Sequence, residues 1–354
     1  MKEILEKAFN GEPLDIAEGL RLFESDHLHE IGLYAKKLSE RLNSGRVYFV
    51  VNRHINPTNI CVNRCRFCAF SRSKGETGAY ELSIEDVLER VKSSPAELKE
   101  LHIVGGLHPD RDLGYYEKML SGIKQLRPHV HIKAFTAVEI DYLARKSSLT
   151  VEETLARLKK SGLDAMPGGG AEIFNEEVRA RLCPEKISGK RWLEVHRTAH
   201  KLGIRTNATM LYGHIESNKD RVEHLLALRE LQAETGGFQA FVPLPYHPEN
   251  TYISTRFPSG IDDLKTIAIS RLILNNIPHI KAYWVMLGEK LTQIALCFGA
   301  DDIDGTVIEE KITHSAGAQT EEGLTRERLV ELIKRAGRVP VERDALYNVV
   351  RIYT

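Results

Sequence analysis

The feature that most constrains the fold is an alternation of short apolar runs with helical segments from residue 46 onward. The first run, RVYFVVNRHI at residues 46–55, is rich in β-branched and aromatic residues and predicts a buried strand. Segments with apolar residues at helical spacing separate the later runs. The further expected strands are ELHIVGG, VHIKAFTA, LDAMPGGG, IRTNATMLYG, FQAFVPLPY, HIKAYWVML and, less regular, DDIDGT at residues 301–306. Strands that alternate with helices predict parallel pairing with the helices outside.

Seven or eight such units in 354 residues favour one closed (β/α) barrel of the TIM type, in the α/β class. An open, doubly wound sheet is the alternative, but no Pro/Gly/Ser-rich linker divides the chain into two halves. We expect an N-terminal helical segment packed on the barrel at residues 1–44. The barrel would span residues 45–318, and a C-terminal helical extension would span residues 319–354.

In a barrel of this kind, reactive residues gather at the C-terminal ends of the strands. Glycines, prolines and histidines do follow the expected strands in this sequence. They occur in the segments GGLHP (105–109), PGGGAE (167–172), YGH (212–214) and PLPYHP (243–248). The sequence therefore predicts a functional site on one face of the barrel.

Composition excludes several other classes of protein. Lys+Arg and Asp+Glu both number 49, so no basic excess indicates nucleic acid binding. The N-terminal residues show no apolar signal segment, and no apolar stretch reaches the ~18–20 residues of a membrane span. Five cysteines, three of them clustered, do not resemble a disulfide framework. We expect a cytoplasmic protein that binds neither nucleic acid nor membrane.

The clustered cysteines are Cys61, Cys65 and Cys68, in the segment TNICVNRCRFCAF after the first strand. A role as packed core thiols suits Cys183 and Cys297 better, because charged arginines lie between the clustered thiols. Structural zinc needs four ligands, and the fourth would have to be a residue such as His54. Three thiolates suit a four-iron cluster in which one iron stays open to bind a ligand.

The C-x3-C-x2-C spacing with an aromatic residue before its last cysteine resembles the radical S-adenosylmethionine (SAM) superfamily. The resemblance implies a [4Fe-4S] cluster on Cys61, Cys65 and Cys68. It also implies that the open iron binds the amino and carboxylate groups of SAM, and that reduction cleaves SAM into methionine and a 5′-deoxyadenosyl radical.

Four further residues acquire cofactor-binding roles from this resemblance. Gly105 and Gly106 would receive the amino group of SAM through the backbone, Glu172 would bind the ribose, and Phe67 would pack near the adenine. Without the resemblance, the glycines would be a tight turn, Phe67 a core residue and Glu172 an acid at a helix N-terminus.

Within the superfamily, the segments HINPTNIC, FCAFSRSKGE, GAYELS, HIVGGLHP, NATMLYGHIE and LPYHPENT are most similar to the aminodeoxyfutalosine synthases of menaquinone biosynthesis. The resemblance implies addition of the adenosyl radical to the vinyl ether of 3-[(1-carboxyvinyl)oxy]benzoate. Aryl migration, loss of a carboxyl group as bicarbonate or CO₂, and oxidation would then give 6-amino-6-deoxyfutalosine. The related dehypoxanthine futalosine cyclases and deazaflavin synthases remain alternatives, and a non-catalytic iron–sulfur or zinc protein is a remote one.

This small-molecule substrate is a dicarboxylate, so its pocket needs local cations or hydrogen-bond donors. We expect Arg53, His54 and His247 to contact it and to be the catalytic residues, with Lys133, Arg205, His108 and His214 as further basic groups near strand ends. The segment SRSKGETGAYELS is either a lid or an exposed connection. The partners would include an electron donor such as flavodoxin or ferredoxin, and the chain could form a homodimer.

Overall fold

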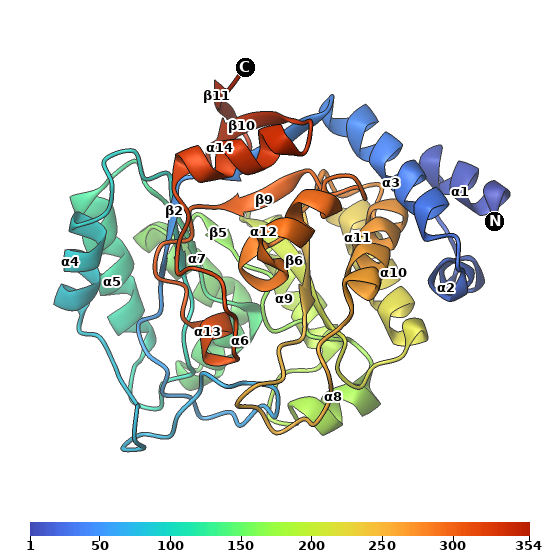
Figure 1. Ribbon diagram of the computed structural model, residues 1–354. Coiled ribbons are helices and arrows are strands. Elements are labelled where there is room, and N and C mark those ends of the chain that lie inside the picture. The colour runs from blue at the N-terminus through green and yellow to red at the C-terminus, as the bar shows by residue number, and fades with distance from the viewer.

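Seven parallel strands form the main sheet of the computed structural model, which describes all residues 1–354 (Figure 1). Each strand pairs with the next one along the chain, as expected where a helix returns the chain to the same end of the sheet. The strands are β2 (Asn52–Ile55), β3 (Glu100–Ile103), β4 (His131–Ala134), β5 (Ala165–Met166), β6 (Arg205–Tyr212), β7 (Phe238–Pro245) and β8 (His279–Ile280).

Residues 302–308 join the two edges of this sheet. Strand β9 (Asp302–Gly305) meets β8 through a bridge between Lys281 and Asp302, and Ile308 bridges to Arg53 of β2. The His54 amide also donates to the Ile308 carbonyl over 2.9 Å. The strands thus form a closed ring, which confirms the predicted α/β barrel and the last short strand expected in DDIDGT.

Helices surround the strands, as the alternation in the sequence predicts (Figure 1). They are α4 (Ile84–Lys92), α5 (Leu113–Leu126), α6 (Ala137–Lys146), α7 (Val151–Ser161), α8 (Glu176–Leu182), α9 (Gly189–Lys201), α10 (Asn218–Thr235), α11 (Gly260–Ile273), α12 (Trp284–Ala295) and the short α13 (Ile312–Ser315). Several begin with a capping box, in which a Ser or Thr and an acid three residues later satisfy each other's backbone N–H. None of these helices combines the length and the hydrophobicity of a membrane-spanning segment.

The first residues form three helices, α1 (Lys2–Phe9), α2 (Ile16–Glu24) and α3 (Leu28–Asn43), beside α10 and α11 (Figure 1). Close packing explains two of their glycines. A Cβ atom on Gly19 would lie 2.7 Å from Val222, and one on Gly32 would lie 2.5 Å from the Phe298 ring. These helices therefore cover the outer surface of the barrel.

The C-terminal segment contains helix α14 (Arg326–Arg335), as expected, and two strands that the sequence did not predict. β10 (Val339–Arg343) pairs in parallel with β1 (Arg46–Val50), and β11 (Val349–Ile352) pairs antiparallel with β10. A four-stranded sheet in the order β11-β10-β1-β9 results.

The expected strand HIKAYWVML is shorter than predicted. Only His279–Ile280 is extended, because helix α12 begins at Trp284, whose indole N–H donates to the Gly305 carbonyl over 2.9 Å. A short buried apolar run is compatible with a strand or a helix, so periodicity alone did not separate the two.

Candidate active site

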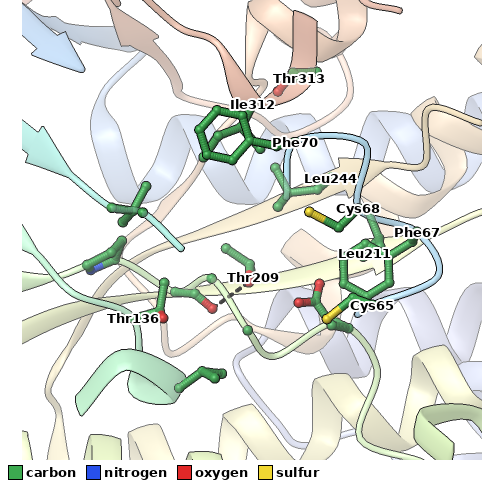
Figure 2. A pocket seen from close by; sticks show the side chains of 18 of the residues that line it. Cys65, Phe67, Cys68, Phe70, Thr136, Thr209, Leu211, Leu244, Ile312 and Thr313 are labelled. Carbon is green, nitrogen blue, oxygen red and sulfur yellow. Dashed lines mark hydrogen bonds between the residues drawn. The ribbon is translucent and has the colours of Figure 1, made fainter. Parts of the chain in front are cut away.

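A cavity of about 360 Å³ opens among the loops at the C-terminal ends of the strands, where barrel enzymes place their active sites (Figure 2). Cys65, Cys68, Phe67 and Leu211 lie together on one side, and Thr136 lies across from them (Figure 2). The predicted site residues that line this cavity are His54, Cys61, Cys65, Phe67, Cys68, Gly105, Gly106, Glu172 and His247.

The loop that carries the thiols follows β2 and is fixed by its own backbone. The Cys61 amide donates to the Arg72 carbonyl, and the Val62 amide donates to the Leu107 carbonyl, both over 3.0 Å. Asn59 also binds the loop through its side chain, which donates to the Gly78 carbonyl over 2.9 Å and accepts from the Tyr80 amide over 2.8 Å. Asn59 therefore shapes the loop, and a rigid loop can present three thiols in one arrangement.

The thiols fit an iron–sulfur cluster by their chemistry and placement. All three are free, Cys65 is buried, and Cys61 and Cys68 are partly exposed. Burial raises the pKa of the Cys65 thiol to about 12, so a bound metal would have to displace its proton. No three metal-ligating side chains converge on a single-ion site. Thiolates at separate irons of a cluster lie farther apart than the ligands of one zinc ion, so this set suits a cluster.

The turn after β3 lies against the thiol loop. A Cβ atom on Gly106 would lie 2.2 Å from the Ile60 carbonyl oxygen and 3.0 Å from Cys61 Cβ. A Cβ atom on Gly105 would lie 3.0 Å from the Thr58 carbonyl oxygen. Only glycine permits this approach, and it leaves the backbone of the turn open to a ligand in the cavity.

Glu172 follows a second glycine turn, at residues 168–170 after β5. It lines the cavity and forms an ion pair with Lys186. The Lys186 ammonium lies 2.5 Å from a Glu172 oxygen, and 4.8 Å from the centre of the Phe67 ring. Burial by itself would lower the pKa of Lys186, but the nearby Cys65 and Glu172 have the larger, opposite effect. The pKa is therefore raised overall, and the side chain stays charged. Lys186, which the sequence did not indicate, thus contacts both Glu172, the predicted ribose-binding residue, and Phe67, the predicted neighbour of the adenine.

The inner end of the cavity is polar. His54 and His102 stack with ring centres 4.5 Å apart, and burial lowers the pKa of both imidazoles, which are therefore neutral. The Nε2 atom of His54 is buried without a hydrogen-bond partner. Lys133 also reaches this end and pairs with Glu100 over 2.7 Å. An anionic ligand could accept hydrogen bonds from this group.

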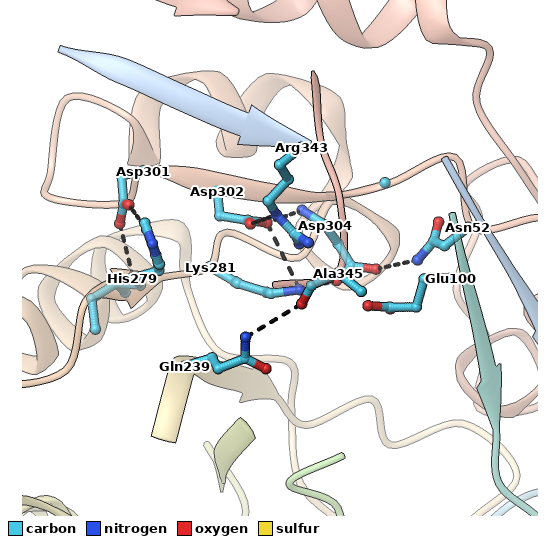
Figure 3. A network of polar contacts seen from close by, with 12 residues as sticks. Asn52, Glu100, Gln239, His279, Lys281, Asp301, Asp302, Asp304, Arg343 and Ala345 are labelled. Atoms are coloured by element: carbon cyan, nitrogen blue, oxygen red, sulfur yellow. Dashed lines mark hydrogen bonds and ion pairs between the residues drawn. The ribbon is translucent and has the colours of Figure 1, made fainter. Parts of the chain in front are cut away.

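A network of buried charges forms the floor beneath these residues (Figure 3). Arg343, from the C-terminal strand β10, pairs with Asp302 over 2.8 Å, and Lys281 pairs with Asp304. The Asn52 amide side chain donates to Asp304 over 3.2 Å. Each charge has a partner of opposite sign, so the floor supports the cavity without needing a ligand.

Four of the basic residues named from the sequence, Arg53, Arg205, His108 and His214, lie outside the cavity. Arg53 points to the opposite face of β2 from His54, where it pairs with Glu309 over 2.9 Å and donates to the Arg90 carbonyl over 2.7 Å. Alternation of side chains along a strand explains this separation. Arg205 is exposed at the start of β6, and His108 and His214 lie beside Glu81 and Glu216 respectively.

The roles of Arg53 and His247 stay predictions. Arg53 could affect a ligand only indirectly, because its partner Glu309 precedes Glu310, which lines the cavity. His247 lines the cavity itself, with its Nε2 atom 3.1 Å from the Met286 carbonyl oxygen and its Nδ1 atom buried without a partner.

The sequence analysis missed Lys186, His102 and Glu139 as cavity residues. His102 lies two residues after Glu100, and polar pairs at this spacing recur in β4 and β9. Polar residues at alternate positions of an expected strand are the signal that could have identified the polar interior. No comparable signal exists for Lys186, because its position depends on how the α8–α9 connection folds back.

Comparison with known families agrees with this geometry. The radical SAM superfamily matches residues 55–228, and the CofH/MqnC C-terminal region matches residues 235–353. The aminodeoxyfutalosine synthase of Thermus thermophilus is 45% identical over 99% of this chain and 96% of its own length. The chain therefore belongs to the radical SAM superfamily. It is an enzyme that carries a [4Fe-4S] cluster and uses SAM.

The relatives do not all share one named activity. The aminodeoxyfutalosine synthase of Streptomyces coelicolor is 44% identical over 99% of this chain and 94% of its own. The 5-amino-6-(D-ribitylamino)uracil–L-tyrosine 4-hydroxyphenyl transferase of Archaeoglobus fulgidus is also 44% identical, over 89% of this chain and 92% of its own. Overall identity therefore defines the kind of enzyme more sharply than its substrate.

Solved structures support the fold. The FeFe-hydrogenase maturase HydG from Carboxydothermus hydrogenoformans superposes with a TM-score of 0.75 at 19% identity, over 98% of this chain and 80% of its own. Methylornithine synthase (PylB) superposes with a TM-score of 0.71 at 18% identity, over 94% of this chain and 95% of its own. At this identity, the likeness concerns the barrel alone.

Proposed function

We propose that the enzyme joins the adenosyl group of SAM to 3-[(1-carboxyvinyl)oxy]benzoate and releases methionine, giving 6-amino-6-deoxyfutalosine for menaquinone biosynthesis. The reaction would form a carbon–carbon bond from C5′ to the vinyl ether, move the aryl group and release one carboxyl group as bicarbonate or CO₂. A one-electron oxidation of the rearranged radical would then return the electron that was used to cleave SAM. The near full-length identity with two aminodeoxyfutalosine synthases supports this assignment. The alternative to be excluded is the transferase activity named for the archaeal relatives.

One observation of the structure carries the proposal. A single cavity holds the three thiols at one side and the His54, His102 and Lys133 group at its inner end. The cluster, when bound on Cys61, Cys65 and Cys68, supplies the electron that cleaves SAM, and an electron donor such as flavodoxin or ferredoxin would reduce it. The second substrate would then lie between the adenosyl group and the floor.

Residues of the inner end would bind the carboxylates of that substrate. The neutral imidazole of His54 can donate through Nε2, which has no partner within the protein. Lys133 supplies a positive charge, although Glu100 balances it in part. His247, which follows β7, has a buried Nδ1 atom without a partner and would bind the second carboxylate of the substrate.

Apolar side chains close the space between these groups. Leu211, Leu244, Phe70 and Ile312 face the cavity around the thiols (Figure 2). A radical reaction needs such a wall, because water and reactive side chains would quench the radical. The wall also makes any polar contact inside the cavity stronger than it would be in water.

Product analysis tests the proposal. Anaerobically reconstituted enzyme, a reductant, SAM labelled with carbon-13 at C5′ and the enolpyruvyl benzoate should give a labelled product with the mass of 6-amino-6-deoxyfutalosine. Free 5′-deoxyadenosine in step with turnover would instead identify a hydrogen-abstracting enzyme of the cyclase type. Turnover of 5-amino-6-(D-ribitylamino)uracil with tyrosine, and none of the benzoate, would overturn the assignment.

A further inference from the structure

Glu139 is the one acidic residue of the cavity wall without a cationic partner. The other acids of the wall each have one, because Glu172 pairs with Lys186, Asp304 with Lys281 and Glu310 with His314. Glu139 is 8% exposed and belongs to no ion pair. A buried charge without a counter-ion is costly, so a cationic ligand at this position would be strongly favoured.

The hydrogen bonds of Glu139 place its carboxyl group beside the first glycine turn. One oxygen accepts from the Gly105 amide over 3.2 Å. The other oxygen accepts from the backbone and hydroxyl groups of Thr136, over 2.7 and 2.9 Å, and closes the capping box of α6. These donors are neutral, so they hold the carboxyl group in place but leave its charge uncompensated.

The second glycine turn, at residues 168–170, also packs against the start of α6. A Cβ atom on Gly169 would lie 3.0 Å from Thr136 Cγ2, and one on Gly170 would lie 2.5 Å from Val138 Cγ2. The start of α6 is therefore packed between the turn that includes Gly105 and the turn that leads to Glu172. A molecule that spans both turns must pass the Glu139 carboxyl group.

We propose that Glu139 is the anionic partner of the amino group of SAM, holding the methionine part between the two glycine turns. The inference rests on the use of SAM and is independent of the identity of the second substrate. Burial raises the pKa of Glu139 to about 7 in the free protein, so the carboxyl group readily exchanges its proton near neutral pH. A cationic ligand would favour the ionised form.

A capping box can be a purely structural feature, and the chain provides a matched control for that explanation. Thr150 and Glu153 form the same box at the start of α7, with hydrogen bonds of 2.8 Å from the backbone and hydroxyl groups of Thr150. Glu153 is exposed and lies outside the cavity. Glu139→Gln and Glu153→Gln therefore remove the same capping charge, but only the first one changes the cavity.

The experiment measures equilibrium binding to the cluster-loaded enzyme under anaerobic conditions. The ligands are SAM, S-adenosylhomocysteine, which keeps the amino group but lacks the sulfonium, and 5′-methylthioadenosine, which lacks both. Glu139→Gln should weaken SAM and S-adenosylhomocysteine by the same factor, at least about tenfold, because it removes a buried charge-assisted hydrogen bond. Binding of 5′-methylthioadenosine should change less than about twofold, and Glu153→Gln should leave all three ligands unchanged.

Three outcomes would overturn the proposal. Unchanged binding of SAM to Glu139→Gln would show that the carboxyl group does not contact it. Weakening of SAM alone would assign the charge to the sulfonium. Equal weakening of all three ligands would show that Glu139 acts through the shape of the site. Thermal unfolding of both variants identifies any general loss of structure, and the product assay decides the reaction separately.

Discussion

The mouth and the floor of the barrel differ in whether their buried polar groups have partners within the chain. At the floor, every buried charge has a partner in the chain, as in the pair Glu100–Lys133 and the pair Asp302–Arg343 (Figure 3). At the mouth, Cys65 is buried as an unpaired thiol and Glu139 lacks a counter-ion. We infer that the floor is complete as the chain folds, whereas the mouth, the end of the cavity with the thiol loop and Glu139, is completed when the cluster and SAM bind.

The largest expected effect separates function from stability at the mouth. Cys65→Ala should abolish cluster binding and lower activity more than about a hundredfold, since even residues behind metal ligands change affinity 10–100-fold. The free energy of unfolding of the cluster-free protein should change by less than about 2 kcal/mol. Iron content and absorbance measure cluster binding, the product assay measures activity, and denaturant unfolding measures stability.

Cys297→Ala is the control for this change, because Cys297 lies outside the cavity and is exposed, which corrects the expectation that it is a packed core thiol. It should bind the cluster like the unmodified enzyme. A Cys65→Ala protein with a full complement of iron would contradict the assignment of Cys65 as a ligand.

The floor should show the reverse pattern. Arg343→Met leaves the buried Asp302 with only its longer contact to Lys281, at 3.8 Å, and should destabilise the protein by about 3–5 kcal/mol, as breaking a buried ion pair does. Arg335→Met removes an exposed pair with Glu331 and should cost less than about 1 kcal/mol. Urea unfolding of the cluster-free variants measures both. A similar small effect of both substitutions would show that the floor is not the scaffold of the cavity.

Acid should weaken the floor through Glu100. Burial alone would raise its pKa, but the Lys133 ammonium and other nearby cations lower the pKa to about 2. A carboxyl group with a depressed folded-state pKa stabilises the protein above its unfolded pKa of ~4.3, and this contribution disappears as the pH falls towards 2.

The loss between pH 5 and pH 2 should therefore reach up to about 3 kcal/mol in the free energy of unfolding. The double variant Glu100→Gln, Lys133→Met removes both charges, so its stability should depend less on pH in this window. Equal acid sensitivity of the two proteins would place the responsible carboxyl groups elsewhere.

His54 lies between the floor and the mouth, at the inner end of the cavity. Its substitution should affect the benzoate substrate but not SAM. His54→Gln should lower kcat/KM for the benzoate about tenfold, the effect of losing one hydrogen bond to a charged group, and leave the affinity for SAM unchanged. His131→Gln is the control, because His131 lies at the start of β4 and outside the cavity. Equal effects of the two substitutions would remove His54 from the proposed carboxylate site.

The sequence allowed the mouth to be predicted better than the floor. At the mouth, each functional group belongs to a short motif at the end of a strand, namely the thiol loop, the two glycine turns and Glu172. Such a motif can be recognised because its residues are neighbours in the sequence. The floor joins Asn52, Glu100, Lys281 and Arg343, which are far apart in the sequence. Arg343 in particular reaches the barrel only through β10, an unpredicted strand whose pairing with β1 no local pattern specifies.

The two faces of β2 give the smallest and most specific test. Arg53 and His54 are adjacent, yet Arg53 is fixed outside the cavity by Glu309, the Arg90 carbonyl and the hydroxyl groups of Ser93 and Ser94. Arg53→Gln should therefore change KM for the benzoate by only about two- to threefold, through the segment that holds Glu310.

The expected loss of stability is larger than this change in KM, at about 1–3 kcal/mol, because the substitution leaves part-buried acceptors without a donor. Steady-state kinetics and urea unfolding on the same preparation compare the two. If Arg53 bound a substrate carboxylate directly, KM would rise at least about tenfold and Arg53→Lys would restore part of it. That result would move the carboxylate site from the inner face of the strand to its outer face, and the division between a ligand-dependent mouth and a self-sufficient floor would then have to include the β2–α4 side of the barrel.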